Sequence, residues 1–309
     1  MQRLDFRAMG CYMLALIDST NPDATEALAL VPTWFEEWEN VLSRFRDNSE
    51  LSALNRADGK PFQASETLFL VLQASLQAAQ DSAGLVTPTL LDAVQAAGYD
   101  RSFDALAKSM ERATIAAEIF DWHSIELDEK NRTVRLPRGM HLDFGGIAKG
   151  WAADQAAARL SAIAPALVDA GGDIAISARQ DNEEWSIGIA DPFRPESDLE
   201  LLMVECGGVA TSGRDYRRWQ RNGKWQHHII NPRTGEPADT DVLSATVIAP
   251  TTQQAEVAAK TALILGSRAG MEWLERHETL AGLFVLEDGT IVRSSTMERY
   301  LWREPVVLN

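Results

Sequence analysis

The chain has 309 residues, of which 45% are hydrophobic and 24% are charged, and its formal net charge is −16 at pH 7. This composition is typical of a globular protein with enough chain to bury a large core. The strong acidic balance argues against nucleic acid or an anionic membrane surface as the main partner, because both require a basic face.

The N-terminus and the cysteine content bear on location. The opening, MQRLDFRAMGCYMLALIDS, has no basic segment followed by a long apolar one, and no run approaches the ~18 apolar residues of a membrane span. The chain has only two cysteines, Cys11 and Cys206, which are expected to be unpaired thiols in a reducing compartment. We therefore expect a cytoplasmic protein without membrane insertion.

The first third of the chain predicts a strand followed by helices. The apolar stretch 10–18 predicts the strand. Pro22 suits the first position of a helix, which Pro32 is expected to kink or split. Ser65 is expected to cap a second helix, which ends at Gly84.

Strands dominate the middle of the chain, and both kinds of element occur near its end. A helix is predicted from Thr252 to Leu265, ended by Gly266, with a shorter one around 271–276 and an Asp-Gly hairpin signal at 288–289. No linker composition divides the chain, and no regular βαβ order appears. We expect an α+β fold with mixed or antiparallel sheets flanked by helices, as one compact domain over 1–309. The predicted strands of the middle and late regions are 133–136, 167–177, 185–191 and 242–250.

A glycine turn in HLDFGGIAKGWAAD (141–154) is the first candidate site. If a helix begins near Ile147, the N–H groups of Gly145 to Ala148 are expected to point outward unpaired and to form an anion site. Lys149 adds a charge in the first turn, where the helix dipole disfavours lysine. The alternative is that Lys149 is merely exposed and that Asp143 caps the helix.

Three further glycine turns follow apolar strands, at Gly171-Gly172, at 211–213 and at 232–235. Glycine is used where the backbone approaches a ligand closely or takes a positive φ. Four such turns indicate one cleft lined by loops. His228 is the plausible proton acceptor of this set at neutral pH, although a single histidine is more often structural.

Taken together and in chain order, eight segments resemble the ApbE family of FAD:protein FMN transferases. Each segment alone is a weak signal, but their collinear order over most of the chain is a strong one. The segments are AMGCYM (8–13), LSRFRDNSELSALNR (42–56), AGLVTPTLLDAV (83–94), LDFGGIAKGWAAD (142–154), VDAGGDI (168–174), ATSGRDYRRW (210–219), HHIINPRTGEP (227–237) and SATVIAPTTQQAEVAAKTALILG (244–266).

The resemblance implies a T-fold-like α+β domain that binds FAD, with a divalent metal, usually magnesium, at the pyrophosphate. It implies transfer of the FMN half of FAD to a threonine or serine of an acceptor protein, with release of AMP. It places His228 as the residue that activates the acceptor hydroxyl and the Gly146 carbonyl at the metal. The implied cofactor-binding residues are Met9, Arg44, Leu85, Val86, Thr87, Asp143, Lys149 and Ile230.

One segment departs from the family pattern, in which an Asp and a Thr four residues apart both bind the metal. Thr261 is present, but Val257 stands four residues before it, and Glu256 is one residue away, ~100° around a helix. Either the helix is rotated so that Glu256 joins Gly146 and Thr261 as a metal ligand, or Lys260 replaces the metal, or the site binds flavin without transferring it. A solvated ion pair of Glu256 with Lys260 is the remaining interpretation.

Three activities therefore stay open. The first is transfer of FMN to a partner protein, whose identity the sequence does not give. The second is FAD binding without catalysis, and the third is FAD pyrophosphatase activity, which yields FMN and AMP with water as the acceptor. The flavin-attachment motif of an acceptor protein is absent from this chain, so modification of the chain by itself is not expected.

Overall fold

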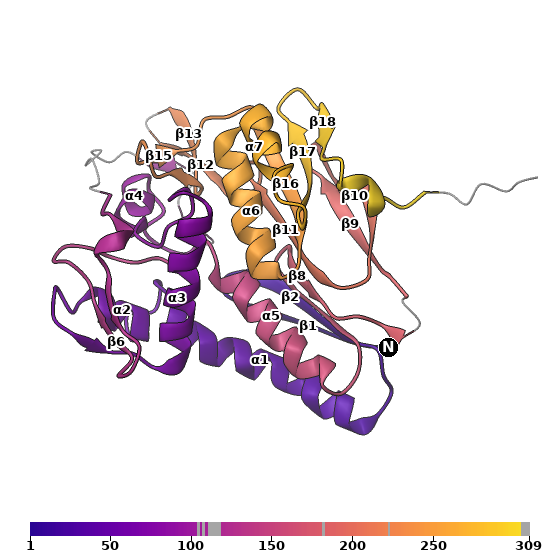
Figure 1. Cartoon of the computed structure of the whole chain (residues 1–309), viewed down its shortest axis with the longest axis horizontal. Coiled ribbons are helices and arrows are strands. Elements are labelled where there is room, and N and C mark those ends of the chain that lie inside the picture. The colour runs from indigo at the N-terminus through magenta and orange to yellow at the C-terminus, as the bar shows by residue number, and fades with distance from the viewer. Residues whose placement is uncertain (104–105, 107–108, 111–118, 181–182, 222, 304–309) are drawn as a thin grey trace, which may run out of the picture.

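A central sheet of eight strands organises the chain. Figure 1 shows the computed structural model. The structure describes residues 1–103, 106, 109–110, 119–180, 183–221 and 223–303. Every neighbouring pair of strands in this sheet is antiparallel. In spatial order the strands are β1 (Gln2–Ala8), β2 (Cys11–Ile17), β7 (Ala166–Ala170), β8 (Asp173–Ile176), β11 (Gly207–Gly213), β16 (Val242–Ala249), β17 (Ala281–Leu286) and β18 (Ile291–Arg293).

Both faces of the sheet are covered, and the alternation of side chains along its strands explains how. Val247 packs with the helices α6 and α7, whereas its neighbour Ile248 packs with the hairpin of β9 and β10 on the other face. The helices lie together on one face in Figure 1. They are α1 (Pro22–Leu42), α5 (Ala148–Ser161), α6 (Thr252–Leu265) and α7 (Ser267–Leu274), and the hairpin strands are β9 (Trp185–Asp191) and β10 (Arg194–Val204).

Smaller elements gather at one end of the helical layer. Two short sheets, β3-β6-β5 and β13-β12-β4, and the pair β14-β15 complete the strands there. The helices are α2 (Glu50–Asn55), α3 (Glu66–Asp81) and α4 (Leu91–Ala96), with 3-10 turns at Trp122–Ser124 and, elsewhere, at Met297–Arg299. The strands are β3 (Phe62–Gln63), β4 (Ser109–Met110), β5 (Glu126–Asp128), β6 (Thr133–Arg135), β12 (Arg218–Arg221), β13 (Lys224–His227), β14 (Ile230–Asn231) and β15 (Glu236–Pro237).

The predicted α+β class is confirmed, and so are the local signals that start and end several helices. Ser65 caps α3 by accepting the N–H of Leu68, and Gly266 ends α6 with a φ of 82°. Of the two effects expected of Pro32, a kink or a split, the split does not occur, because the helix runs unbroken from Pro22 to Leu42. Its buried face, which includes Phe35, packs against the core strongly enough to outweigh the hydrogen bond lost at proline.

Other elements also differ from expectation. The helix predicted around 271–276 is α7, which begins earlier, directly after Gly266. The sequence analysis does not predict the strands β1 and β10. Polar or charged residues are interspersed in both, so neither forms an apolar run over its whole length. Among the described residues, none of the helices combines the length and apolar character that crossing a bilayer demands.

Candidate functional site

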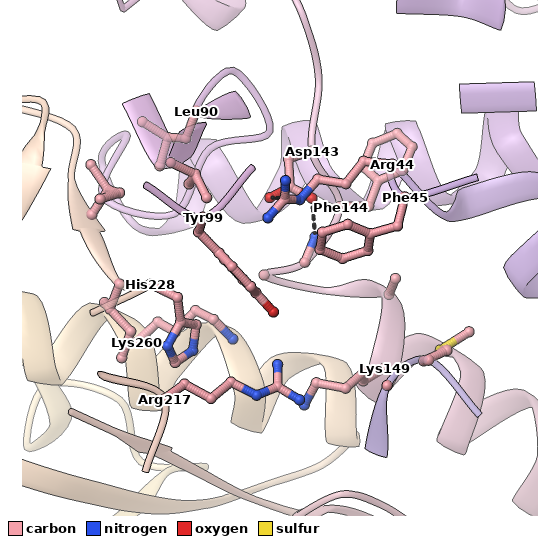
Figure 2. Close-up of a pocket in the computed structure, with 18 of the residues that line it drawn as sticks. Arg44, Phe45, Leu90, Tyr99, Asp143, Phe144, Lys149, Arg217, His228 and Lys260 are labelled. Atoms are coloured by element: carbon pink, nitrogen blue, oxygen red, sulfur yellow. Dashed lines mark hydrogen bonds and ion pairs between the residues drawn. The ribbon is translucent and has the colours of Figure 1, made fainter. Parts of the chain in front are cut away.

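A cavity of about 300 Å³ lies where the helical layer meets the smaller elements. This volume is at the lower end of the range of small-molecule sites. Figure 2 shows Arg44, Phe45 and Asp143 on one side, Lys149, Arg217, His228 and Lys260 on the other, and Tyr99 between them. One side of the cavity is therefore aromatic and cationic, and the other is lined by three cations and an imidazole.

The cavity gathers most of the residues that the sequence singled out. All eight residues expected to bind the cofactor line it, together with the predicted base and one of the three predicted metal-site residues. Their roles stay predictions, but their convergence from distant parts of the chain is a property of the fold. These lining residues are Met9, Arg44, Leu85, Val86, Thr87, Asp143, Gly146, Lys149, His228 and Ile230.

Met9 reaches the cavity from a tight turn between β1 and β2. The pairing of Ala8 with Cys11 leaves a two-residue turn, in which Met9 has a φ of 49° and Gly10 a φ of 68°. Two successive positive φ angles define the type I′ hairpin turn, which non-glycine residues enter at a cost of order 1 kcal/mol. The Met9 N–H donates to Glu39 Oε2 at 2.9 Å, which helps to hold this conformation.

The glycine turn before α5 does not form the predicted anion site. The Gly145 N–H donates to Asp143 Oδ1 at 2.9 Å, and the N–H groups of Ile147 and Ala148 donate to the Phe144 carbonyl at 3.0 and 2.9 Å. The prediction of four outward N–H groups is therefore wrong for these three. Asp143 closes the turn before the helix, but the alternative that it caps α5 is also wrong, because α5 has no side-chain cap. Lys149 is not merely exposed either, since it contacts Asp173 and only 19% of its side chain is exposed. Positive charge in the cavity therefore comes from side chains.

Arg44 builds the aromatic side of the cavity. Its guanidinium lies over the rings of Phe45 and Tyr99, with its Cζ 4.1 and 4.7 Å from their centroids. Its Nε lies 3.5 Å from Asp143 Oδ2, and only 5% of the Arg44 side chain is exposed. A fixed guanidinium stacked with aromatic rings is a surface suited to planar heterocycles.

The opposite side carries two buried ion pairs. Lys149 contacts Asp173, and Lys260 Nζ lies 2.8 Å from Glu256 Oε1. The Glu256 side chain is 1% exposed, so its interpretation as part of a solvated surface pair is wrong. The second oxygen of Glu256 accepts the Gly150 N–H at 2.9 Å, which ties α6 to α5.

This donor set does not fit a divalent cation. Both Glu256 oxygens are engaged, and Thr261, although its Oγ1 is buried without a hydrogen-bond partner, is not among the described residues that line the cavity. Val257 packs in a hydrophobic cluster. Within the described part of the chain, no group of three or more His, Cys, Asp or Glu side chains is placed to hold a metal. Of the three predicted ligands, only Gly146 borders the cavity.

His228 lines the cavity as a neutral imidazole. Burial, together with the positive charges of Arg217 and Lys260, holds the pKa of His228 well below its usual value. Its Nδ1 is buried and has no hydrogen-bond partner within the described structure. An imidazole that is unprotonated at neutral pH can accept a proton, which is the first requirement of a general base.

Phe45, Tyr99 and Arg217 are among the cavity residues that the sequence analysis does not single out. Phe45 and Arg217 lie inside segments that resemble the family, but neither has a local motif of its own. Tyr99 follows α4 and reaches the site by packing near Trp219, with ring centroids 5.6 Å apart. The Arg217 Nη2 donates to Cys11 Sγ at 2.8 Å, a contact across more than two hundred positions that no sequence spacing reveals.

Comparison with known proteins agrees with this assembly. The profile of the ApbE family matches residues 9–284. An FAD:protein FMN transferase of Treponema pallidum (strain Nichols) is 34% identical over 294 residues, which cover 87% of this chain and 79% of that protein. One from Klebsiella pneumoniae (strain 342) is 29% identical over 268 residues, with coverage of 84% and 82%.

Solved structures share the fold over nearly the whole chain. The ApbE protein of Thermotoga maritima superposes with a TM-score of 0.87 at 24% identity, covering 98% of this chain and 99% of that one. Flavin transferase ApbE from Vibrio cholerae gives a TM-score of 0.79 at 23% identity, covering 97% and 99%. These likenesses bear on the fold, and the one-domain boundary of 1–309 stays a prediction.

Proposed function

Because the chain belongs to the ApbE family, we propose that it transfers the FMN half of FAD to a threonine or serine hydroxyl of another protein. The observation that carries this proposal is the joining, in one cavity, of a stacked aromatic and cationic side with a side that holds three cations and a neutral histidine. The first suits flavin or adenine, and the second suits a pyrophosphate.

The reaction is a phosphoryl-type transfer. A bond forms between the acceptor oxygen and the FMN phosphorus, and the bond from that phosphorus to the bridging oxygen breaks. AMP leaves with the electron pair, and the hydroxyl proton passes to His228. Catalysis of this kind depends on positioning and charge stabilisation. In this chain, Lys149, Arg217 and Lys260 are the cavity-lining cations on the side of His228.

The low pKa of His228 decides what kind of base it is. The residue is unprotonated over the whole neutral range, so it is always ready to accept a proton, but it is a weaker base than an ordinary histidine. We therefore assign it the task of orienting the hydroxyl and taking its proton late, as the new bond forms. The acceptor in this proposal is an unidentified protein. We also propose a cytoplasmic location, which the two free cysteines support.

The test follows both products of the reaction. The full chain is incubated with FAD and a panel of threonine-containing acceptor proteins, with and without Mg²⁺. AMP is measured by chromatography and covalent flavin by fluorescence in a denaturing gel. We expect both products, and we expect His228→Ala to lower their rate by about 10²- to 10⁴-fold. The exposed His277 provides a matched control, since His277→Ala should leave the rate unchanged.

Other outcomes separate the alternatives. AMP and free FMN produced without any acceptor indicate FAD pyrophosphatase activity. Bound FAD without AMP in every condition indicates a binding protein and refutes the transferase proposal.

A further inference from the structure

Two lysines point into the cavity while their carboxylate partners lie behind them. Lys149 and Lys260 line the cavity, with 19% and 15% of their side chains exposed. Asp173 and Glu256 are 3% and 1% exposed. Buried carboxylates thus hold two ammonium groups toward the space where a ligand binds.

The two pairs form one electrostatic cluster. Although burial lowers the pKa of Lys149, the charges of Asp173 and Glu256 raise it more strongly, so Lys149 remains protonated. Burial and the neighbouring Glu256 raise the pKa of Asp173 to about 6, which leaves it ionised at neutral pH. In the free protein, the positive charges of the two lysines balance the negative charges of Asp173 and Glu256. An anion in the cavity approaches this cluster from the side of the lysines.

Lys260 also occupies the space beside the glycine turn. A Cβ built on Gly146 would lie 3.8 Å from both Cδ and Cε of Lys260, so the lysine stem runs against this glycine. Gly146 and Glu256 are two of the three residues expected to hold a metal. The ammonium of Lys260 is already bound to one of them, and its stem packs against the other.

We propose that Lys260 supplies the positive charge that a divalent cation would otherwise supply at the pyrophosphate, so that this chain binds and cleaves FAD without a divalent metal. The inference rests on the proposed function for the identity of the ligand. A pyrophosphate diester carries two negative charges, and the two inward ammonium groups match them. An ammonium in a partly buried site forms charge-assisted hydrogen bonds to phosphate oxygens without needing further ligands.

The experiment compares FAD affinity and AMP release in EDTA and in millimolar Mg²⁺. For the wild-type chain we expect both quantities to agree within about twofold between the two conditions. Lys260→Thr removes the charge and frees Oε1 of Glu256, with a hydroxyl one helical turn away, while Oε2 still accepts the Gly150 N–H. We expect this variant to lose about 10- to 100-fold in FAD affinity in EDTA and to regain part of it with Mg²⁺.

Three further variants sharpen the test. Lys130→Thr, at an exposed position, controls for the loss of a lysine as such and should behave as wild type. The double variant with Lys260→Met and Glu256→Gln removes both charges, so the cluster stays balanced if the single variant folds poorly. It should lose affinity to the same extent with and without Mg²⁺, because the carboxylate of Glu256 beside position 260 is no longer present to bind the ion. Lys260→Arg, which keeps the charge, should stay insensitive to EDTA.

The outcomes distinguish this inference from the proposed function. If wild-type AMP release or FAD binding collapses in EDTA and returns with Mg²⁺, the role of Lys260 is refuted while the transferase activity stands. If Lys260→Thr binds FAD as tightly as wild type in EDTA, the role is refuted as well. If no condition releases AMP, the transferase activity and metal-free cleavage are both refuted. FAD binding that is insensitive to EDTA and depends on Lys260 would then still support metal-free binding.

Discussion

Acidification is expected to destabilise the protein through His227, a buried histidine that the fold holds neutral. Its Nε2–H donates to the Ala238 carbonyl at 3.0 Å, and its Nδ1 accepts the Ile229 N–H at 3.3 Å. Protonation of Nδ1 would place a new N–H donor of His227 opposite the N–H donor of Ile229. Burial is the main cause that lowers the pKa of His227 to about 4.

The sign and size of the effect follow from this pKa. Above pH 6.5 neither state binds a proton at this group. Below pH 6.5 the unfolded chain binds one and the folded chain does not, until the pH reaches about 4. Stability therefore falls as the pH falls through this window. A pKa lowered from 6.5 to about 4, at 1.36 kcal/mol per unit, corresponds to about 3 kcal/mol as an upper bound.

Urea unfolding of the wild-type chain and of His227→Gln, at several pH values between about 7.5 and 4.5, measures this contribution. Glutamine keeps a donor for the Ala238 carbonyl but does not titrate. We expect the wild type to lose up to about 3 kcal/mol more than the variant across the window, beyond the loss from carboxylates, which both share. His277→Gln, at an exposed position, should follow the wild type. Equal losses in wild type and His227→Gln would refute the reasoning.

Three packing predictions follow. Gly150→Ala should destabilise by about 1–3 kcal/mol, because a Cβ there would lie 2.9 Å from the Thr252 carbonyl oxygen; a higher urea midpoint, as helix propensity alone predicts, would contradict this. Asp154→Ala should cost about 1–2 kcal/mol, since its carboxylate accepts the N–H groups of Thr252 and Gln253 at the start of α6. This prediction fails if Asp154→Asn, which keeps one acceptor oxygen, lowers the free energy of unfolding more than Asp154→Ala does. Phe35→Ala should cost about 3–5 kcal/mol in thermal unfolding because the ring is fully buried, and a loss below ~1 kcal/mol would show that the core relaxes around it.

Local signals explain which parts of the fold were predictable. Asn21 accepts the Asp23 N–H at the start of α1, and Ser65 and Gly266 act within a few residues of the helix ends that they define. Such contacts join residues that are close together in the sequence, so the sequence pattern predicts them. The continuity of α1 through Pro32 depends on packing against distant strands, which the local rule for proline does not include.

The sequence predicted which residues line the candidate site better than it predicted how their side chains are oriented. The family pattern selected residues that do line the cavity, yet it did not reveal that Asp143 accepts the Gly145 N–H or that Glu256 turns toward α5. Tyr99 and Arg217 enter through contacts between segments far apart in the chain. These orientations are set by how helices and loops pack, which no spacing of residues encodes.

The cavity takes side chains from almost the entire length of the chain, from Met9 in the first hairpin to Ile264 in α6. The strand β2 pairs with β1 in the first hairpin, but its other neighbour in the sheet, β7, begins about 150 residues later. During synthesis, a chain that ends before α6 therefore lacks Lys260 and one wall of the site. Since a ligand stabilises only the state that binds it, FAD is expected to favour the finished protein and to leave shorter fragments unprotected against proteolysis.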